Sequence, residues 1–96
     1  MNRTKVNAKA RRKIAAIAQE KQLVRCEVKL GGCMLNAHAP AHRHKRVWYY
    51  DKPDELLWNF NQWLAACQAC HNILEGDAQL TARIFEQLRG QDYDQQ

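Results

Sequence analysis

Residues 67–71 read CQACH, and residues 26–33 read CEVKLGGC. In the first stretch two residues separate the cysteines, a spacing that lets both thiolates turn toward one ion. The second stretch has six residues between its cysteines and includes a Gly-Gly turn signal. Two pairs of this kind predict a tetrahedral four-sulfur zinc site formed by Cys26, Cys33, Cys67 and Cys70. Small buried apolar residues and a redox pair are the alternative interpretations of the same cysteines.

A closed four-sulfur site has a structural role, because it leaves no position for a substrate. The chain has 96 residues, which is enough for a single domain over residues 1–96, with a small core that benefits from such a staple. No secretory signal and no apolar run of membrane-spanning length is visible, so we expect a cytoplasmic protein without membrane contact. Cytosolic cysteines bind metal more often than they form disulfides, which favours the zinc interpretation.

Positive charge is concentrated in the first half of the chain. Residues 1–46 hold 12 of the 15 lysine and arginine residues and only two of the ten acidic residues. A basic half of this density favours a polyanionic partner, most simply nucleic acid. A solvated, solubilising helix face would have the same charge pattern, and charge alone does not separate the two interpretations.

The spacing of apolar residues predicts an α+β domain. A basic amphipathic helix is expected over residues 1–22, with a narrow apolar stripe and a wide basic face. Residues 23–30 alternate well enough for a strand, and the Gly-Gly turn leads from this strand to a second extended arm over residues 36–48. The two extended segments would form a β-hairpin.

The second half of the chain is predicted to be helical. Apolar residues recur at helical spacing after Pro53, at Leu56, Leu57, Phe60, Trp63 and Leu64. This pattern predicts one helix, or two short helices with a break near Cys67. A last helix is expected over residues 77–90 with Asp77 as its cap, and residues 91–96 are expected to be frayed.

Four histidines are available for other chemistry if zinc takes the four sulfurs: His38, His42, His44 and His71. In an extended arm, residues two apart point to the same side, so His42 and His44 would share one face, and Arg43 and Lys45 the other. One imidazole can deprotonate water near neutral pH, and another can bind a divalent ion that steadies a phosphate. Surface histidines that contact phosphates, or histidines that supplement the zinc site, are the alternatives.

The order of these motifs resembles that of the HNH endonucleases. A cysteine pair, a histidine-bearing arm, an asparagine and a CxxCH that opens a helix follow one another over residues 24–76. The resemblance is to the zinc-binding four-cysteine branch with the ββα-metal fold, which includes many small phage proteins. It implies an HNH-like core over residues 23–76 between the basic N-terminal helix and the C-terminal helix. It also implies hydrolysis of phosphodiester bonds by a histidine general base and a divalent metal, commonly magnesium, with manganese and nickel as alternatives.

Carried over residue by residue, the resemblance makes His71 a ligand of the catalytic metal. His44 is the expected general base and His42 the expected second metal ligand, and a one-residue bulge would exchange these two roles. HNH proteins usually have two adjacent residues at this place, whereas Arg43 separates the two histidines of this chain.

The asparagine of the family orients the loop that holds the general base. Asn61 is the nearest match in this chain, one residue farther from Cys67 than is usual, and Asn59 is the alternative. The resemblance therefore assigns Asn61 to the catalytic set. The alternative for either residue is an ordinary polar position of a helix.

The resemblance further implies a nucleic-acid partner, expected to be DNA. Cations of the arm and of the N-terminal helix would contact its phosphates: Arg43, Lys45, Arg46, Lys9 and Arg12. Two other functions fit the same motifs, a catalytically inactive zinc-stapled nucleic-acid-binding module and a small phage regulatory factor that binds a protein. The expected location is the cytoplasm of a bacterial host cell, for a chain that a phage could encode.

Overall fold

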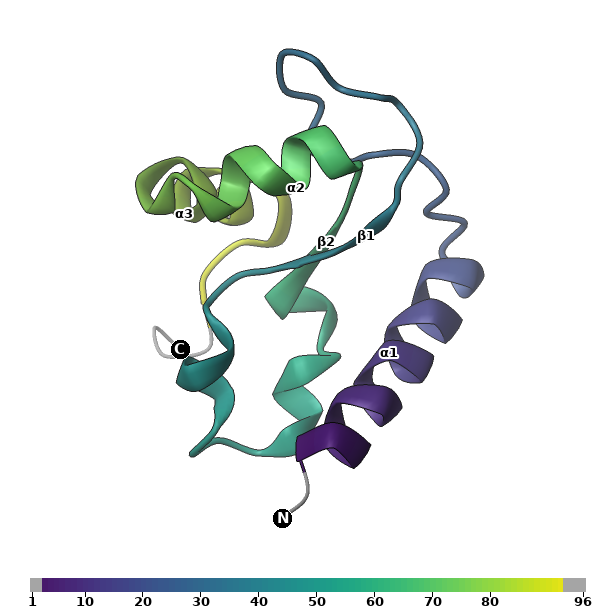
Figure 1. Cartoon of the computed structure of the whole chain (residues 1–96), viewed down its shortest axis with the longest axis vertical. Coiled ribbons are helices and arrows are strands. Elements are labelled where there is room, and N and C mark those ends of the chain that lie inside the picture. Colours follow the sequence, from purple (N-terminus) through teal and green to yellow (C-terminus); the bar gives the residue numbers. More distant parts are fainter. Residues whose placement is uncertain (1–2, 93–96) are drawn as a thin grey trace.

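The computed structural model describes residues 3–92, so the predictions for residues 1–2 and 93–96 lie outside the described part of the chain. The elements are α1 (Arg3–Glu20), β1 (Ala39–His42), the 3₁₀ turns η1 (Arg46–Tyr49), η2 (Asp54–Leu57) and η3 (Phe60–Gln62), β2 (Trp63–Ala66), α2 (Gln68–Glu75) and α3 (Ala78–Arg89). Figure 1 shows the two strands in the middle of the molecule, with α1 on one side and α2 and α3 on the other. The predicted α+β class is confirmed.

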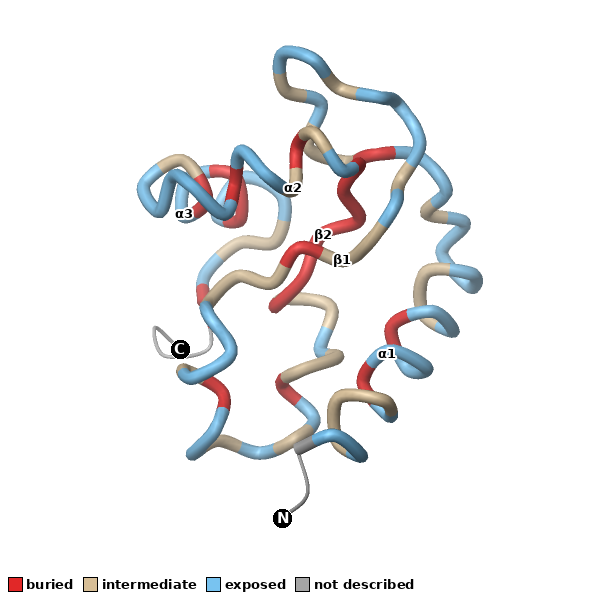
Figure 2. The backbone as a smooth tube through the Cα atoms, in the orientation of Figure 1, coloured by how far each residue is buried: buried red, intermediate tan, exposed pale blue. Residues whose placement is uncertain are grey.

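Strand β2 is buried on both of its faces. It pairs with β1 in antiparallel register, with Ala39 opposite Ala66 and His42 opposite Trp63. Successive side chains of a strand point to opposite faces. Leu64 and Ala66 accordingly belong to the core that α2 and α3 cover, whereas Trp63 and Ala65 pack against α1. Figure 2 shows the resulting continuous buried stretch along β2.

The prediction of a helix before Cys67 is wrong. Residues 54–66 form η2, η3 and β2 instead. A short apolar run such as WLAA fits a buried strand as well as a buried helix, because both bury every side chain. Here the pairing with β1 decides for the strand. The predicted break near Cys67 is confirmed, since Cys67 is the N-cap of α2.

The predicted strand over residues 23–30 is not formed either. Among the described residues, this segment has only an isolated bridge between Arg25 and Asn36. Lys29 has a φ of 56°, in the left-handed region, which does not fit an extended strand. Gly32, with a φ of 81°, lies in the predicted Gly-Gly turn, and this turn is formed. The chain from residue 23 to residue 37 is therefore a loop, here called the cysteine loop, and of the second predicted arm only Ala39–His42 is a strand.

The two outer helices largely follow the predictions. Helix α1 buries Ile14 and partly buries Ile17 and Ala18 against the Trp63 face of β2. Helix α3 begins after Asp77, whose Oδ1 accepts a hydrogen bond from the N–H of Leu80 at 3.0 Å. This capping was predicted, and it satisfies a backbone donor that the first turn leaves without a helical partner.

The chain after α3 does not fray where the structure describes it. Asp92 is 9% exposed, so the predicted frayed tail is wrong at residues 91–92. Hydrogen bonds to main-chain atoms of this segment from Arg43 and Asn61 hold it against the body of the domain. In the described part of the chain, none of the helices combines the length and the apolar character needed to cross a bilayer.

Candidate functional site

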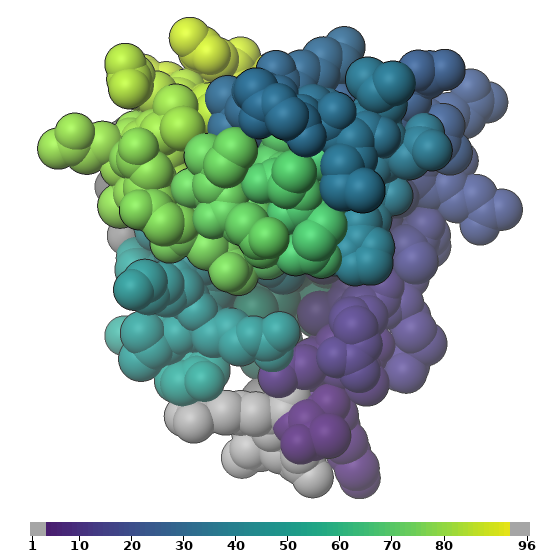
Figure 3. Space-filling view, turned by 45° about the horizontal axis from the view of Figure 1, so that its top comes forward, coloured from purple at the N-terminus to yellow at the C-terminus, as the bar shows by residue number. Residues whose placement is uncertain are grey.

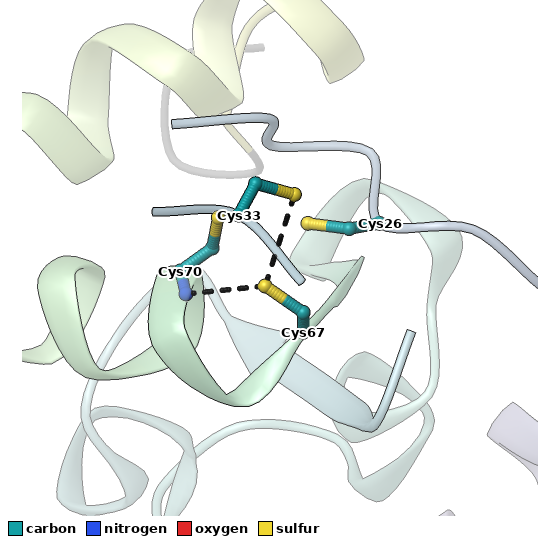
Figure 4. A group of neighbouring side chains, drawn as sticks. All are labelled: Cys26, Cys33, Cys67 and Cys70. Atoms are coloured by element: carbon teal, nitrogen blue, oxygen red, sulfur yellow. Dashed lines mark hydrogen bonds between the residues drawn. The ribbon is translucent and has the colours of Figure 1, made fainter. Parts of the chain in front are cut away.

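The four cysteines gather in one cluster, as the sequence predicts. Their Sγ atoms all lie within 4.8 Å of one another, and all four thiols are free. Cys26 and Cys33 come from the cysteine loop, whereas Cys67 and Cys70 come from the start of α2. Figure 4 shows the four side chains converging from these two segments. The cluster could hold a structural metal ion, of which zinc is the usual one for four thiolates.

Backbone N–H groups of the cysteine loop donate hydrogen bonds to sulfurs of the cluster. The N–H of Met34 donates to Sγ of Cys67 at 3.3 Å, and the N–H of Leu30 donates to Sγ of Cys70 at 3.4 Å. The N–H of Leu35 donates to Sγ of Cys33 at 3.4 Å. N–H donors favour the charged thiolate, which is the form that binds metal. The left-handed conformations in the cysteine loop bring these donors inward instead of forming a strand.

The pKa values of Cys67 and Cys70, the two thiols at the start of α2, are shifted in opposite directions. The N–H groups of Met34 and Cys70 lower the pKa of Cys67 to about 6. Burial raises the pKa of Cys70 to about 12. Charging several adjacent buried sulfurs is unfavourable without a counter-ion, because desolvation and mutual repulsion both oppose it. A bound cation would remove this obstacle, so the donor set fits a metal that is held by thiolates.

A groove of about 950 Å³ runs between β1 with the residues that follow it and the helices α2 and α3. Figure 3 shows the surfaces of α2 and α3 (green) directly next to the teal surface of the η1–η2 segment. Three imidazoles line this groove, together with three cations and three carboxylates: His42, His44, His71, Arg43, Lys45, Arg46, Glu75, Glu86 and Asp92. Three of the four histidines that the zinc prediction leaves free therefore meet at one place. His38 is exposed and lies outside the groove lining.

His42 lies at the end of β1 and is held in one tautomer. Its Nε2 lies 2.8 Å from the carbonyl oxygen of Leu57. Because a carbonyl only accepts, Nε2 has the hydrogen, and Nδ1 of the neutral ring has the lone pair. Burial lowers the pKa of His42, and the charges of Arg46 and His71 act in the same direction, whereas the Leu57 carbonyl opposes them. A neutral imidazole whose N–H is bound by a backbone carbonyl is the usual arrangement of a metal-ligating histidine.

His44 belongs to a closed chain of hydrogen bonds. Its Nε2 is bonded to Oδ2 of Asp92, and Oδ1 of Asp92 accepts from Nε2 of Gln62 at 2.7 Å. Oε1 of Gln62 accepts from the hydroxyl of Tyr49 at 3.0 Å, and this hydroxyl accepts from the N–H of His44 at 3.2 Å. The imidazole also stacks on Trp48 with 3.8 Å between ring centroids. Both the backbone and the ring of His44 are thus fixed.

His71 follows Cys70 in the first turns of α2. Its Nδ1 lies 3.6 Å from Oε1 of Glu75, one helical turn farther on. Both side chains line the groove, since residues four apart share one face of a helix. The cysteine cluster holds the start of α2, so it also determines where this imidazole lies.

Arg43 does not lie where the sequence analysis expected it. Its side chain is 7% exposed. The guanidinium donates to both the backbone oxygen and Oδ1 of Asn61, at 3.3 and 3.2 Å, and to the carbonyl of Gly90 at 2.8 Å. Its Nε lies 3.9 Å from Asp92. The chain bends after His42, so the alternation of an extended arm ends there and Arg43 turns inward. Its N–H groups donate to Asn61 and Gly90 within the domain, so the predicted contact of Arg43 with a phosphate would require a different orientation of the side chain.

Asn61 connects Arg43, next to His44, with residues 89–91. Its Oδ1 accepts from Arg43 and from Nε2 of Gln62, and its Nδ2 donates to the carbonyls of Arg89 and Gln91 at 3.2 and 3.0 Å. Asn59 has a local role, because its Oδ1 accepts from the N–H of Asn61 at 2.9 Å and caps η3.

The cations of α1 lie on a different surface from the groove. Lys9 and Arg12 are exposed, but α1 covers the opposite face of the strand pair and none of its residues lines the groove. Lys45 and Arg46 are exposed and do line it. The two surfaces meet at Arg46, which also lines a smaller pocket of about 200 Å³ beside the first turns of α1. A polyanion that contacts both the groove and the exposed cations of α1 would therefore have to pass over Arg46.

Sequence reasoning missed the partners of the histidines. Asp92 lies in a tail that was expected to fray, and no local pattern connects it to His44, which is 48 residues away. Gln62 had a weak signal, because it lies one residue nearer to Cys67 than Asn61, which is the spacing usual for the asparagine of the HNH family. Glu75 could have been recognised from its helical spacing with His71.

Comparisons with protein-family models, with curated proteins and with solved structures found no match for this chain. The chemistry of the groove and of the cysteine cluster is therefore the basis for inferring a function.

Proposed function

We propose that this protein is a metal-dependent endonuclease of the HNH type, with a ββα-metal core, that hydrolyses phosphodiester bonds in DNA. One observation carries the proposal: His42, His44 and His71 line a single groove beside the four-cysteine cluster, and exposed Lys45 and Arg46 line the same groove. Imidazoles supply a general base and metal ligands, and the cations attract a phosphate backbone.

In this proposal the cysteine cluster holds a structural zinc ion. Four thiolates complete a tetrahedral shell, so no ligand position remains for chemistry at the zinc. The ion would tie the cysteine loop to the start of α2 and hence to His71. The cluster would thus determine the position of His71 in the site, because His71 directly follows the buried ligand Cys70.

His42 and His71 are the residues that would hold a catalytic divalent metal. The Leu57 carbonyl fixes the ring of His42, and the carboxylate of Glu75 lies beside the ring of His71. Partners of this kind orient metal-bound imidazoles. When bound, a divalent cation would stabilise the negative charge on the phosphate and on the leaving oxygen. Imidazole ligands suit transition metals such as nickel, whereas magnesium and manganese prefer oxygen ligands, so nickel belongs in any assay beside magnesium and manganese.

His44 is the proposed general base. Its Nε2 is bonded to Asp92, which leaves Nδ1 to accept a proton from the water that attacks phosphorus. Lys45 and Arg46 would hold neighbouring phosphates without reading the base sequence. Binding should therefore weaken as the salt concentration rises. If His42 and His44 exchange roles, the groove and the reaction stay the same.

A plasmid-nicking assay with magnesium, manganese or nickel tests the proposal. We expect the wild type to cleave, and His42→Ala, His44→Ala and His71→Ala to lose most of the activity. His38→Ala is the matched control, because His38 is exposed outside the groove. No cleavage with any of the three metals, or equal cleavage by all four variants, would contradict the proposal.

A nucleic-acid-binding module without catalysis is the second candidate. It is favoured by Arg43, which separates His42 from His44 where HNH endonucleases usually have two adjacent residues. The side chain of Arg43 turns inward and donates to Gly90 instead of facing a substrate. A gel-shift assay separates the candidates. Binding of DNA that depends on Lys45 and Arg46, with no cleavage in any metal, would establish the binding module.

A further inference from the structure

Residues 90–92, which follow α3, are docked against the groove by specific contacts. Gly90 has a φ of 83°, a left-handed conformation that ends α3 and turns the chain. The carbonyl of Gly90 then accepts from Arg43, and the carbonyl of Gln91 accepts from Asn61. These contacts bring Asp92, which is 9% exposed, to the lining of the groove.

The two carboxylate oxygens of Asp92 have different partners, and Nε of Arg43 lies 3.9 Å from Oδ1. Oδ1 accepts from Nε2 of Gln62 at 2.7 Å, and Oδ2 is bonded to Nε2 of His44. Gln62 is fully buried, and the hydroxyl of Tyr49 holds its other end. The amide of Gln62 therefore prevents the carboxylate from rotating, so the oxygen that meets His44 is defined.

Two further contacts restrain His44 in addition to the bond with Asp92. It stacks on Trp48, and its backbone N–H donates to the hydroxyl of Tyr49. With a carboxylate as the partner of Nε2, the neutral ring has its hydrogen on Nε2 and its lone pair on Nδ1, because an ionised carboxylate only accepts. A base that a third group orients in this way is the arrangement found behind activated water and nucleophiles.

We propose that Asp92 is the positioning residue of the general base: it determines which nitrogen of His44 has the hydrogen and leaves Nδ1 as the proton acceptor. This inference rests on the proposed nuclease function and deepens it. Asp92 itself touches neither water nor phosphate in this role, and it acts only through His44.

The substitution Asp92→Asn tests the role with almost no change in shape. The Asn oxygen can still accept from Gln62, but its Nδ2 donates where Oδ2 accepted. His44 must then accept with Nε2 and have its hydrogen on Nδ1. We expect kcat for plasmid nicking to fall by about 10²-fold or more, with little change in KM, because a base in the wrong tautomer loses its catalytic contribution. Asp51→Asn is the matched control, since this carboxylate is 84% exposed and is paired with Lys52.

A second readout does not depend on cleavage. In ¹⁵N NMR spectra at one neutral pH, His44 of the wild type should be protonated at Nε2, and His44 of Asp92→Asn should be protonated at Nδ1. His38 should not change between the two spectra. Asp92→Glu keeps an acceptor at this place, so it should restore the Nε2–H form and part of kcat even if both variants melt at lower temperature.

The outcomes separate this inference from the proposed function. Full kcat in Asp92→Asn, an unchanged tautomer of His44, or equal losses in Asp92→Asn and Asp92→Glu would overturn the positioning role and leave Asp92 a structural ion-pair partner. If the wild type cleaves nothing, the nuclease proposal fails. The positioning role in catalysis then fails with it, and the NMR comparison decides whether Asp92 still determines the tautomer of His44.

Discussion

Replacing Cys67 with serine removes one sulfur from the cysteine cluster and keeps the cap of α2. Cys67 is the N-cap of this helix, and its Sγ accepts from the N–H of Cys70 at 3.4 Å. Serine is among the best N-cap residues, so its hydroxyl can replace this bond. A loss of stability in Cys67→Ser therefore reports the cysteine cluster and not the helix cap, and chelation of the same samples separates the metal from the other contacts of the sulfur.

The cysteine loop is held by the cysteine cluster and by Glu27, whose N–H donates to the carbonyl of Ala65 at 2.8 Å and whose carboxylate is paired with Arg89 at 2.7 Å. Its apolar residues Val28 and Leu30 are only partly buried, and the loop has no regular secondary structure between residues 26 and 35. A structural zinc contributes about 10–16 kcal/mol in small zinc-dependent domains, or about 2.5–4 kcal/mol for each of four sulfurs if they share it equally. A loss of this size shifts the melting temperature of a domain of this length by about 10–30 °C, since 1 kcal/mol corresponds to about 4–8 °C.

The assay is thermal unfolding followed by circular dichroism, with metal analysis of the same samples. The wild type should contain zinc and melt at a lower temperature after chelation, whereas Cys67→Ser should contain less zinc and respond less to the chelator. Met34→Ser is the control in the same loop, because Met34 is 64% exposed and its hydrogen bond to Cys67 comes from the backbone N–H, which serine keeps. The reasoning is refuted if Cys67→Ser melts together with the wild type, or if the fully folded wild type is free of metal.

Three further predictions concern the core, the groove and its cations. Leu64→Ala should cost about 2–5 kcal/mol in urea denaturation, because Leu64 is fully buried; Leu88→Ala, at a 42% exposed position, should cost about 1 kcal/mol or less. Burial lowers the pKa of His42 below its ordinary value of 6.5, so the unfolded chain binds this proton more tightly than the folded chain. Stability should consequently fall as the pH drops below 6.5, and His42→Gln should reduce the slope; an equal slope in both proteins would argue against a buried neutral imidazole. Arg43→Ala should cost about 3 kcal/mol or more, since it removes the hydrogen bonds of the guanidinium to Asn61 and Gly90 and its positive charge beside buried Asp92. Lys45→Ala should leave stability within about 0.5 kcal/mol and make the logarithm of DNA affinity fall less steeply with the logarithm of salt concentration, by about one. If Arg43→Ala is as stable as Lys45→Ala, the inward placement of the guanidinium is wrong.

The cysteine cluster could be predicted because its signal is local. Two residues between Cys67 and Cys70 place both thiols at the first turn of one helix, whatever the rest of the chain does. The second pair was less specific, and the cluster confirms that it joins the first. The shape of the cysteine loop could not be predicted, since its backbone bends toward the sulfurs through left-handed residues that alternation does not reveal.

The strand β2 shows where local reasoning fails. Trp63 and Leu64 fit the helical spacing that begins at Leu56, and nothing within the segment excludes a helix. The pairing with β1 and the burial of both faces, by α1 and by the α2–α3 pair, make the strand the better solution. Secondary structure of a short apolar run is decided by its neighbours in space.

By itself, the sequence determined what can be read within one or two helical turns: the amphipathic α1, the cap at Asp77, the cysteine pair of α2 and the presence of free histidines. Only the tertiary structure decided which histidines meet in the groove, why Arg43 points inward and that Asp92 lies against His44. The physical reason is the distance along the sequence over which each interaction acts. Helical spacing and caps act over a few residues, whereas a buried carboxylate finds its histidine only after the chain has folded back over 48 residues.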